Sequence, residues 1–542
     1  MHTSRRGFIA LGTTAAAATG LTACGGDAAT TAEDGTPIVR VQVVKDARTK
    51  PMSELPWTAA LAEAAGCRIE WLETPGSSWD QQKKASLAAG DVADVTIGGF
   101  GAGDMADFGS LFLDLTPELG AMPNLSALFD KEPYAQVIST TTDGKILGSP
   151  TVAGPVTARS SNHMFINKQW LDTLGLEVPT TWGELEDCLQ AFKDGDPTGT
   201  GETVIPLDFN APATDGFGLF NPNILLSSFG IVVSSGALGM YAQGGTVKNY
   251  LTDDRYRTLI SYLRGLWEKG LISEEAFTHD WSGYTGTAKG SGDTAKVGVT
   301  WMWTPSDVFG KELGPQYVTI PALVAEEGQR DPLVWTFNGD DLSYQANRAV
   351  ISADVANKDA ALKLVDLFYS PDFTVQARYG AFDTCVTRKA ENDYEVLEPA
   401  DPAQADGWQF VNSLADGAPG WIREDMKLAL PAGQTEYKQI DAVYDENFAN
   451  IDFNEDVLYS NMPTTPEQSR TLAQNATGIN QNAMASFAKW ITQGGIDEEW
   501  NSYVTSLENN KLAESISVQQ QIYDAYKKQM STLGVDLSSL GD

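Results

Sequence analysis

The chain has few residues of the kinds that form disulfides or bind transition metals, with four cysteines and three histidines in 542 residues. Cys67, Cys188 and Cys385 are widely spaced, odd in number, and without the Cys-x-x-Cys spacing of zinc or redox sites. We expect these three thiols to be free and buried. Only His163 and His279 lie beyond the first residues, so we expect no histidine-rich metal site.

Positive charge is also scarce. The chain has 37 Lys and Arg against 72 Asp and Glu, a formal net charge of −35. Such a field repels a phosphate backbone, so nucleic acid is disfavoured as a partner. It also repels acidic ligands at long range, although a local arginine cluster could still hold one. A neutral ligand is the simpler expectation.

Long hydrophobic runs are missing after Cys24, where no stretch reaches the roughly 20 apolar residues that a membrane-spanning helix needs. Before it, Ser4 to Ile9 carries a twin-arginine pattern and a short apolar stretch follows, which is typical of an export signal. Leu21 to Cys24 resembles a bacterial lipobox. This resemblance implies a signal peptide over 1–23, lipidation of Cys24, and a polar tether over 24–36.

The body is then expected to be lipid-anchored at the extracellular face of the cell membrane. The alternative for Cys24 is a buried thiol in an ordinary helix. A chain of this length is expected to form at least two domains.

The first part of the body alternates between strand and helix patterns. Strands are predicted at 38–44, 67–71 and 95–97, with helices at 57–64 and 78–89 between them. This rhythm predicts an α/β fold with a parallel sheet. Ligands of such sheets bind beyond the carboxyl ends of the strands, which places the glycine-rich turn Gly98 to Asp104 at a possible ligand site.

Three further elements are well marked. Thr181 and Glu184 form a capping-box pair at the start of a predicted helix. Residues 296–303 alternate like a strand. Asn357 is positioned to cap a later helix with an apolar stripe from Ala361 to Phe368.

Several segments in fixed order resemble one family. Asp143 to Pro150, Phe165 to Leu171 and Gly175 to Trp182 are similar to its run "DGKxYGxP…INKxWLxxLGLxxPxTW". Residues 89–95, 295–299 and 357–364 are similar to its "SGDxPDV", "GKxGM" and "NPEAALKL" pieces. The chain thus resembles the extracellular solute-binding proteins of ABC importers, of the long alginate-binding and YtcQ-like type, related to maltose-binding protein.

This resemblance implies the type II periplasmic-binding-protein fold, in which hinge strands connect two lobes that each contain a central sheet flanked by helices. By analogy, lobe 1 would hold 37–153 and 304–374, and lobe 2 would hold 154–303 and 375–542. The implied role is capture of an oligosaccharide between the lobes and its delivery to the permease subunits and ATPase of the importer. The protein is then expected to be a monomer, with no cofactor and no enzymatic activity.

The sequence departs from the family at one loop. Long members often carry a calcium loop of the form D-P-x-G-N-G-x-x-D-E-I-P, and Asp196 to Pro206 keeps its glycines. Thr200 replaces the middle oxygen donor, and Thr203 with Val204 replaces the Asp-Glu pair. Because calcium prefers six to eight oxygen ligands with several carboxylates, calcium at the Asp196 loop is possible but disfavoured.

A sugar ring needs flat aromatic surfaces for its CH face and polar groups for its hydroxyls. Tryptophans near small and polar residues, in segments that the hinge analogy places at the cleft, are the stacking candidates: Trp281, Trp301, Trp303 and Trp335. Core packing stays open for Trp301 and Trp303, and Trp408 and Trp421 are held in reserve. Candidates for hydroxyl binding are Asp104, Asn210, Asp340 and Asp341, each of which could instead be a solvated loop residue.

Two rival functions stay open. The 72 carboxylates could include the catalytic pair of a secreted surface glycoside hydrolase or polysaccharide lyase, although no nucleophile elbow, His-Glu-x-x-His or P-loop motif is present. A lipoprotein adhesin that presents a rigid surface is the second rival. The ligand class itself, sugar, peptide or lipid precursor, is not decided by these residues.

Overall fold

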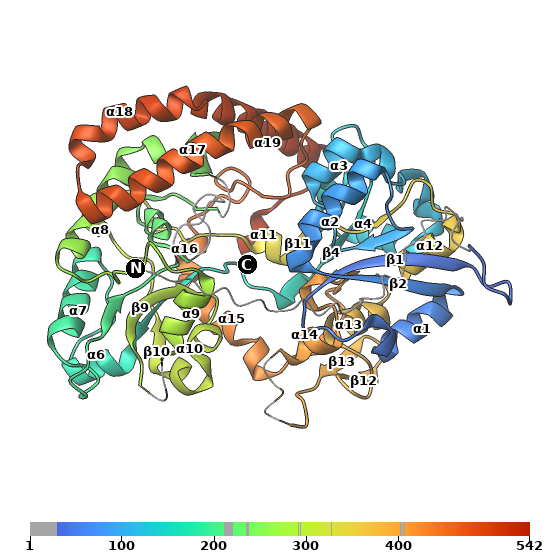
Figure 1. The fold of residues 1–542 in the computed structure, drawn as a ribbon, viewed down its shortest axis with the longest axis horizontal. Coiled ribbons are helices and arrows are strands. Elements are labelled where there is room, and N and C mark those ends of the chain that lie inside the picture. Colours follow the sequence, from blue (N-terminus) through green and yellow to red (C-terminus); the bar gives the residue numbers. More distant parts are fainter. Residues whose placement is uncertain are drawn as a thin grey trace, which may run out of the picture.

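The chain folds into two lobes that lie side by side, each built around a β-sheet (Figure 1). The computed structural model describes residues 30–210, 220–234, 238–290, 292, 294–326, 328–401, 404 and 407–541. The α/β, two-lobed architecture predicted from the sequence is confirmed. The export signal, Cys24 and the start of the tether lie outside the described residues. The described end of the tether packs on lobe 1, since the amide of Ile38 donates to the carbonyl of Thr30.

The sheet of lobe 1 has six strands in the order β14-β4-β11-β3-β1-β2. Their bounds are β1 (Ile38–Lys45), β2 (Arg68–Pro75), β3 (Val95–Ile97), β4 (Ser149–Val152), β11 (Tyr344–Ile351) and β14 (Gly420–Trp421). Strand β1 runs parallel to β2 and β3, as the strand and helix rhythm predicted. Val39, Val41 and Val43 are fully buried, which explains the β-branched run in this strand.

Helices cover both faces of this sheet. They are α1 (Pro56–Ala65), α2 (Gly76–Ala89), α3 (Ala102–Phe108), α4 (Pro123–Lys131), α5 (Pro133–Ser139), α12 (Lys358–Leu367), α13 (Pro371–Tyr379) and α14 (Trp408–Asn412). Helix α1 ends where predicted, because Gly66 takes a left-handed conformation with φ of 72°. Asn357 precedes α12, but its side chain donates to the carbonyls of Thr30 and Ile38 and makes no cap. A small sheet of β12 (Val386–Ala390), β13 (Asp393–Val396) and β15 (Lys427–Ala429) adjoins α13.

The sheet of lobe 2 has the order β10-β5-β9-β6. Its strands are β5 (His163–Asn167), β6 (Ile205–Leu207), β9 (Val297–Met302) and β10 (Tyr317–Thr319), and a hairpin of β7 (Met240–Gln243) and β8 (Thr246–Asn249) lies apart from it. Every residue of β9 is buried, since this strand lies between β5 and β6 and is covered on both faces. The strand predicted over 296–303 is confirmed as β9.

The helices of lobe 2 surround this sheet. They are α6 (Lys168–Leu174), α7 (Trp182–Asp194), α8 (Asp254–Glu268), α9 (Trp281–Lys289), α10 (Pro305–Leu313), α15 (Glu436–Asp441) and α16 (Asp445–Phe448), and α11 (Gly339–Ser343) lies where the chain passes back to lobe 1. The capping box of α7 forms as predicted: Thr181 accepts from the amide of Glu184, and the Glu184 carboxylate accepts from the amide of Thr181.

Three C-terminal helices pack on lobe 2, and two of them, α17 and α19, reach across to lobe 1 (Figure 1). They are α17 (Pro466–Gln493), α18 (Ile496–Asn509) and α19 (Leu512–Leu533). Helix α17 packs against α8 of lobe 2 and touches α3 of lobe 1, while α19 packs against α5. Among the described residues, no helix combines the length and apolarity needed to cross a bilayer. Cys67, Cys188 and Cys385 are free and buried, as predicted.

Two of the predicted lobe boundaries are wrong. Residues 304–374 were assigned to lobe 1, but β10 pairs with β5 in lobe 2, and Tyr317 stacks on Phe309 of α10 at 3.5 Å. Residues 375–542 were assigned to lobe 2, but β14 pairs with β4 in lobe 1. The chain therefore crosses between the lobes after β4, at α11, and between β15 and α15.

Candidate ligand-binding site

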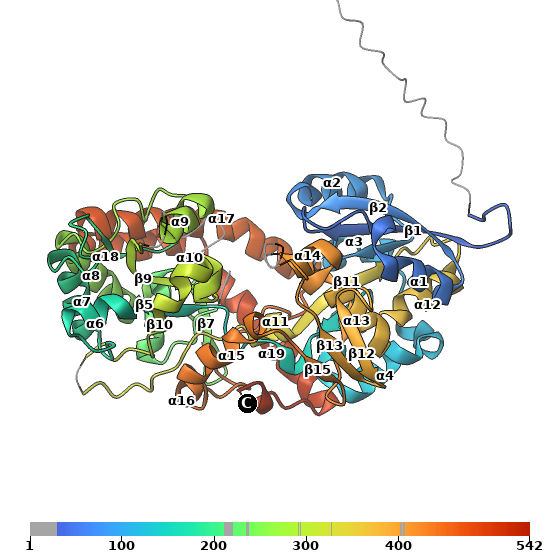
Figure 2. The same cartoon turned by 90° about the horizontal axis from the view of Figure 1, so that it is seen from below.

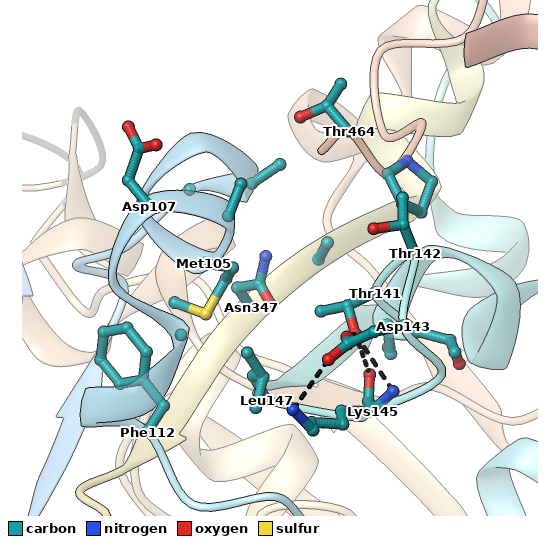
Figure 3. Close-up of a pocket in the computed structure, with 18 of the residues that line it drawn as sticks. Met105, Asp107, Phe112, Thr141, Thr142, Asp143, Lys145, Leu147, Asn347 and Thr464 are labelled. Carbon is teal, nitrogen blue, oxygen red and sulfur yellow. Dashed lines mark hydrogen bonds and ion pairs between the residues drawn. The ribbon is translucent and has the colours of Figure 1, made fainter. Parts of the chain in front are cut away.

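A pocket of about 680 Å³ lies where lobe 1 meets the segment that enters α17 (Figure 3). Its walls are α3 with the residues just before and after it, the end of α5 with the residues that follow it up to Leu147, Ala346 and Asn347 of β11, and the segment 461–466. We call this the junction pocket. Its volume lies within the range of small-ligand sites, roughly 300–1,000 Å³.

The lining of the junction pocket combines apolar and polar side chains. Met105, Phe112 and Leu147 supply the apolar part. Beside Leu147, Lys145 pairs with the carboxylate of Asp143 at 2.7 Å, and this neighbour lowers the pKa of Asp143 below its ordinary value. A surface of this mixed kind can contact both the CH faces and the hydroxyls of a sugar.

The glycine-rich turn after β3 reaches this pocket, as its position in the sequence predicted. Gly101 and Ala102 line the wall. Asp104 does not take part, because its carboxylate accepts from the amide of Gly101 at 2.9 Å and from Lys83 at 3.0 Å. Asp104 was predicted to bind hydroxyls, but its carboxylate instead holds the start of α3 against α2.

An exposed aromatic group lies on lobe 2. Trp281 is the first residue of α9, and 51% of its surface is exposed. Its ring lies 5.8 Å from that of Phe220 and 5.9 Å from that of Tyr284, and both of these are buried. We call these three residues the aromatic platform. Helix α9 lies on the side of lobe 2 that faces lobe 1 (Figure 2).

Two other predicted residues lie at the same edge of the lobe 2 sheet. Strands β6 and β9 run parallel, so the residues after their carboxyl ends come out on one side. Asn210 follows β6 and is half-buried. Its backbone N–H donates a hydrogen bond of 3.0 Å to the backbone carbonyl of Phe220. Trp303 follows β9 and is half-buried, with its carbonyl 2.7 Å from Nδ1 of His163.

Trp301 and Trp335 belong to the core. For Trp301 this is the alternative that the sequence left open, and for Trp335 it contradicts the predicted stacking role. Trp301 has no exposed surface, since it lies within the central strand β9. Trp335 is 1% exposed, stacks on Tyr444 at 4.0 Å, and donates its Nε1 hydrogen to the carbonyl of Asn162 at 2.9 Å. Neither indole face is open to a ligand. Their sequence neighbours were a poor guide, because Trp301 is buried by strand pairing and Trp335 by its packing on Tyr444.

Asp340 and Asp341 lie in α11, at the crossing between the lobes, and line a second pocket of about 240 Å³. The carboxylate of Asp341 accepts from the hydroxyl of Ser460 and from the amide of Asn461. Burial and, to a smaller extent, the neighbouring Asp341 raise the pKa of Asp340 to about 8. These contacts join α11, at one crossing between the lobes, to the segment that leads into α17.

A buried pair beneath the aromatic platform was missed by the sequence reasoning. The side chains of Asp208 and His279 are 1% and 4% exposed, and Oδ1 of Asp208 lies 3.9 Å from Nε2 of His279. Burial raises the pKa of Asp208 to about 6. The available signal was an aspartate directly after a buried strand, between Leu207 and Phe209.

On lobe 1, the reserve candidate Trp408 is the first residue of α14 and is half-buried. Helix α14 lies on the side of lobe 1 that faces lobe 2 (Figure 2). Beside it, the guanidinium of Arg48 lies 4.4 Å from the ring centre of Phe410. The other reserve candidate, Trp421, is buried in β14.

The family model described as bacterial extracellular solute-binding protein matches residues 51–374, which is more than half of the chain. The chain belongs to this family. This confirms the resemblance of its motifs to solute-binding proteins. The two lobes and the pairing of distant strands described above are thus those of a solute-binding protein.

Several solute-binding proteins are similar over nearly the whole chain. One is a human milk oligosaccharide (HMO) binding, ABC-transporter-associated solute-binding protein from Bifidobacterium longum infantis, with 36% identity and a TM-score of 0.87 over 91% of this chain and all of that one. The fructooligosaccharide ABC transporter substrate-binding protein FusA of Streptococcus pneumoniae is 28% identical over 491 residues, 86% of each chain. The structure of FusA with kestose has 25% identity and a TM-score of 0.77, covering 91% and 99% of the two chains.

The Asp196 loop of this solute-binding protein is closed by its own hydrogen bonds. The carboxylate of Asp196 accepts from the amide of Gly201 at 3.1 Å and from the hydroxyl of Thr198 at 3.2 Å. In the described part of the chain, no three His, Cys, Asp or Glu side chains are grouped closely enough to hold a metal ion. The weak calcium expectation for this loop stays a prediction.

Proposed function

We propose that this protein is the substrate-binding component of an ABC importer and captures a neutral oligosaccharide between its two lobes. The relatives named above support the ligand class, since HMO and fructooligosaccharide binding are attributed to them. The net charge of −35 favours a neutral ligand over an acidic one.

The observation that carries the proposal is the exposed indole of Trp281. About half of the surface of this tryptophan is exposed, and its ring packs on Phe220. It therefore presents an uncovered apolar face on the side of lobe 2 that faces lobe 1. Such faces are typical of binding sites. We propose that Trp281 stacks on a sugar ring, with Trp303 and Asn210 beside it, and that Trp408 meets the ligand from lobe 1.

Closure would couple binding to transport. The three crossings between the lobes form a hinge, and a ligand that contacts both lobes favours the closed arrangement because only that arrangement offers both sets of contacts. The permease subunits would bind the closed form, and the ATPase would drive release into the membrane pathway. In this proposal the protein acts as a monomer at the outer face of the membrane, held by lipid on Cys24, and changes no covalent bond of its ligand.

A thermal-shift screen with neutral oligosaccharides, including kestose and neutral HMOs, tests this function. We expect at least one to raise the melting temperature in a saturable way, because a ligand that binds the folded state stabilises it. A reducing-end assay on the same mixtures should stay at background. New reducing ends or unsaturated products would instead support a surface glycoside hydrolase or polysaccharide lyase. The absence of a shift with every neutral oligosaccharide would contradict the proposal.

A further inference from the structure

The buried pair Asp208 and His279 has an unusual hydrogen-bond arrangement. Nε2 of His279 lies 2.8 Å from the carbonyl of Phe209. A carbonyl can only accept, so Nε2 carries the hydrogen. Nδ1 of His279 and both carboxylate oxygens of Asp208 are buried without a hydrogen-bond partner in the described part of the protein. Buried polar atoms of this kind are costly and are often found where a group has a functional role.

Both residues connect directly to the aromatic platform. On one side, Phe209 precedes Asn210, whose amide donates to the carbonyl of Phe220 at 3.0 Å. On the other side, His279 lies two residues before Trp281, and its ring lies 5.5 Å from that of Tyr284. The hydrogen bond from His279 to Phe209 thus bridges the two segments that carry the proposed sugar contacts.

The charges around Asp208 come from a small set of groups. Burial raises the pKa of this carboxyl, His279 lowers it, and Glu275 raises it. The phenol of Tyr284 on α9 also faces Asp208, and its own pKa is raised by burial and by this carboxyl. The amide of Phe209 and the hydroxyl of Ser273 lie close enough to lower the pKa of Asp208, although neither meets hydrogen-bond geometry. The result is a pKa for Asp208 of about 6, within the range of ordinary environmental pH.

We propose that Asp208 and His279 are a proton-sensitive positioning pair that controls the placement of Asn210 against Trp281. When Asp208 is a neutral acid, the Nε2 hydrogen of His279 stays on the carbonyl of Phe209, which is the arrangement observed. When Asp208 loses its proton to solvent, the carboxylate attracts the same hydrogen away from Phe209. The two segments then lose the bridge that holds them together.

One consequence rests on the proposed function. Oligosaccharide affinity depends on whether Asp208 is protonated, and this affinity falls as the pH rises and Asp208 loses its proton. By linkage, a bound oligosaccharide must in turn raise the pH at which the pair titrates.

A ligand-free measurement tests the pair itself. The protein is labelled with 5-fluorotryptophan, and the ¹⁹F resonance of Trp281 is assigned with a Trp281→Phe variant. We expect the Trp281 signal to shift between pH 5 and pH 7.5 with a midpoint near the titration of Asp208, while the buried Trp57 of lobe 1 stays unchanged. The shift should vanish in Asp208→Asn and persist in Glu275→Gln, which removes an exposed carboxylate facing the same pair.

A flat Trp281 signal in the native protein, or an equal titration in Asp208→Asn, overturns the proposal. The native titration is informative even if a variant fails to fold. The second arm compares the dissociation constant for kestose, or for the neutral HMO with the largest thermal shift, at pH 5.5 and pH 7.5. We expect several-fold weaker binding at pH 7.5 in the native protein and no pH dependence in Asp208→Asn. Failure of every oligosaccharide to bind at either pH would refute the proposed function while leaving the ¹⁹F result intact.

Discussion

The hydroxyl of Tyr526 in α19 donates a hydrogen bond of 2.9 Å to the hydroxyl of Tyr134 in α5, and both side chains are buried. This contact joins the C-terminal helices to lobe 1 beside Tyr344, the first residue of β11. Tyr134, Tyr344 and Tyr526 therefore form a cluster at the junction of the lobes, where any hinge motion must be accommodated.

Tyr526→Phe should destabilise the protein by about 1 kcal/mol, because it removes the donor and leaves the Tyr134 hydroxyl buried without this bond. Urea unfolding measures the change. Tyr503→Phe in α18 is the matched control, since the Tyr503 hydroxyl is buried without a hydrogen-bond partner in the part of the chain described and its loss should be neutral. Equal effects of the two substitutions would show that the Tyr526 bond contributes nothing specific.

Trp281→Ala should weaken oligosaccharide binding by about 2 kcal/mol, a loss of roughly thirtyfold, because a stacked aromatic surface is removed. Calorimetric titration with the ligand found in the thermal-shift screen gives the number. Trp335→Phe serves as contrast, since Trp335 is buried and should lower the melting temperature while leaving affinity unchanged. Unaltered affinity in Trp281→Ala would remove the aromatic platform from the binding site.

Asp208→Asn should change how stability depends on pH. The folded-state pKa of Asp208 is raised from an ordinary 3.8 to about 6, so folding favours its protonated form. The stability contributed by this protonation is fully present below pH 3.8 and is lost as pH rises through about 6. Relative to the native protein, Asp208→Asn should therefore gain up to about 3 kcal/mol between pH 4 and pH 7.5. Denaturant unfolding of both proteins at both pH values measures the gain. If the stability difference between Asp208→Asn and the native protein is the same at pH 4 and pH 7.5, Asp208 does not have a raised pKa.

Asp366→Ala should destabilise lobe 1 by about 3 kcal/mol, since one carboxylate holds the start of a neighbouring helix. Asp366 of α12 accepts from the amides of Asn124 and Leu125 in the first turn of α4, at 2.9 Å each. Removing it leaves these two amides without their partner at a buried helix end. Melting temperature and urea unfolding report the loss. Asp359→Ala, at an exposed position of the same helix, should have little effect.

Local patterns were reliable where a few neighbouring residues decide the structure. The capping box of Thr181 and Glu184 formed as expected, and the helix predicted over 57–64 is α1, which ends at Ala65 before a left-handed Gly66. Lobe membership was less predictable, because pairing between β10 and β5 or between β14 and β4 joins residues far apart in the chain. The local sequence of a short strand does not show which distant strand it pairs with.

The same limit explains the tryptophan candidates. Trp281 begins a helix after the exposed residue Asp280 and is itself exposed, in agreement with its polar sequence neighbours. Trp301 and Trp335 were also stacking candidates, yet β9 lies centrally in its sheet and Trp335 packs on Tyr444 from a distant segment. Their burial depends on tertiary packing, which local composition does not reveal.

Small-angle X-ray scattering with and without the oligosaccharide identified by the thermal-shift screen tests the central claim most directly. If the two lobes close on an intact ligand, the radius of gyration falls as the ligand is added, levels off at one equivalent, and chromatography recovers the ligand unchanged. A radius of gyration that stays constant while the ligand saturates the protein, or recovery of a shortened sugar, would contradict the account.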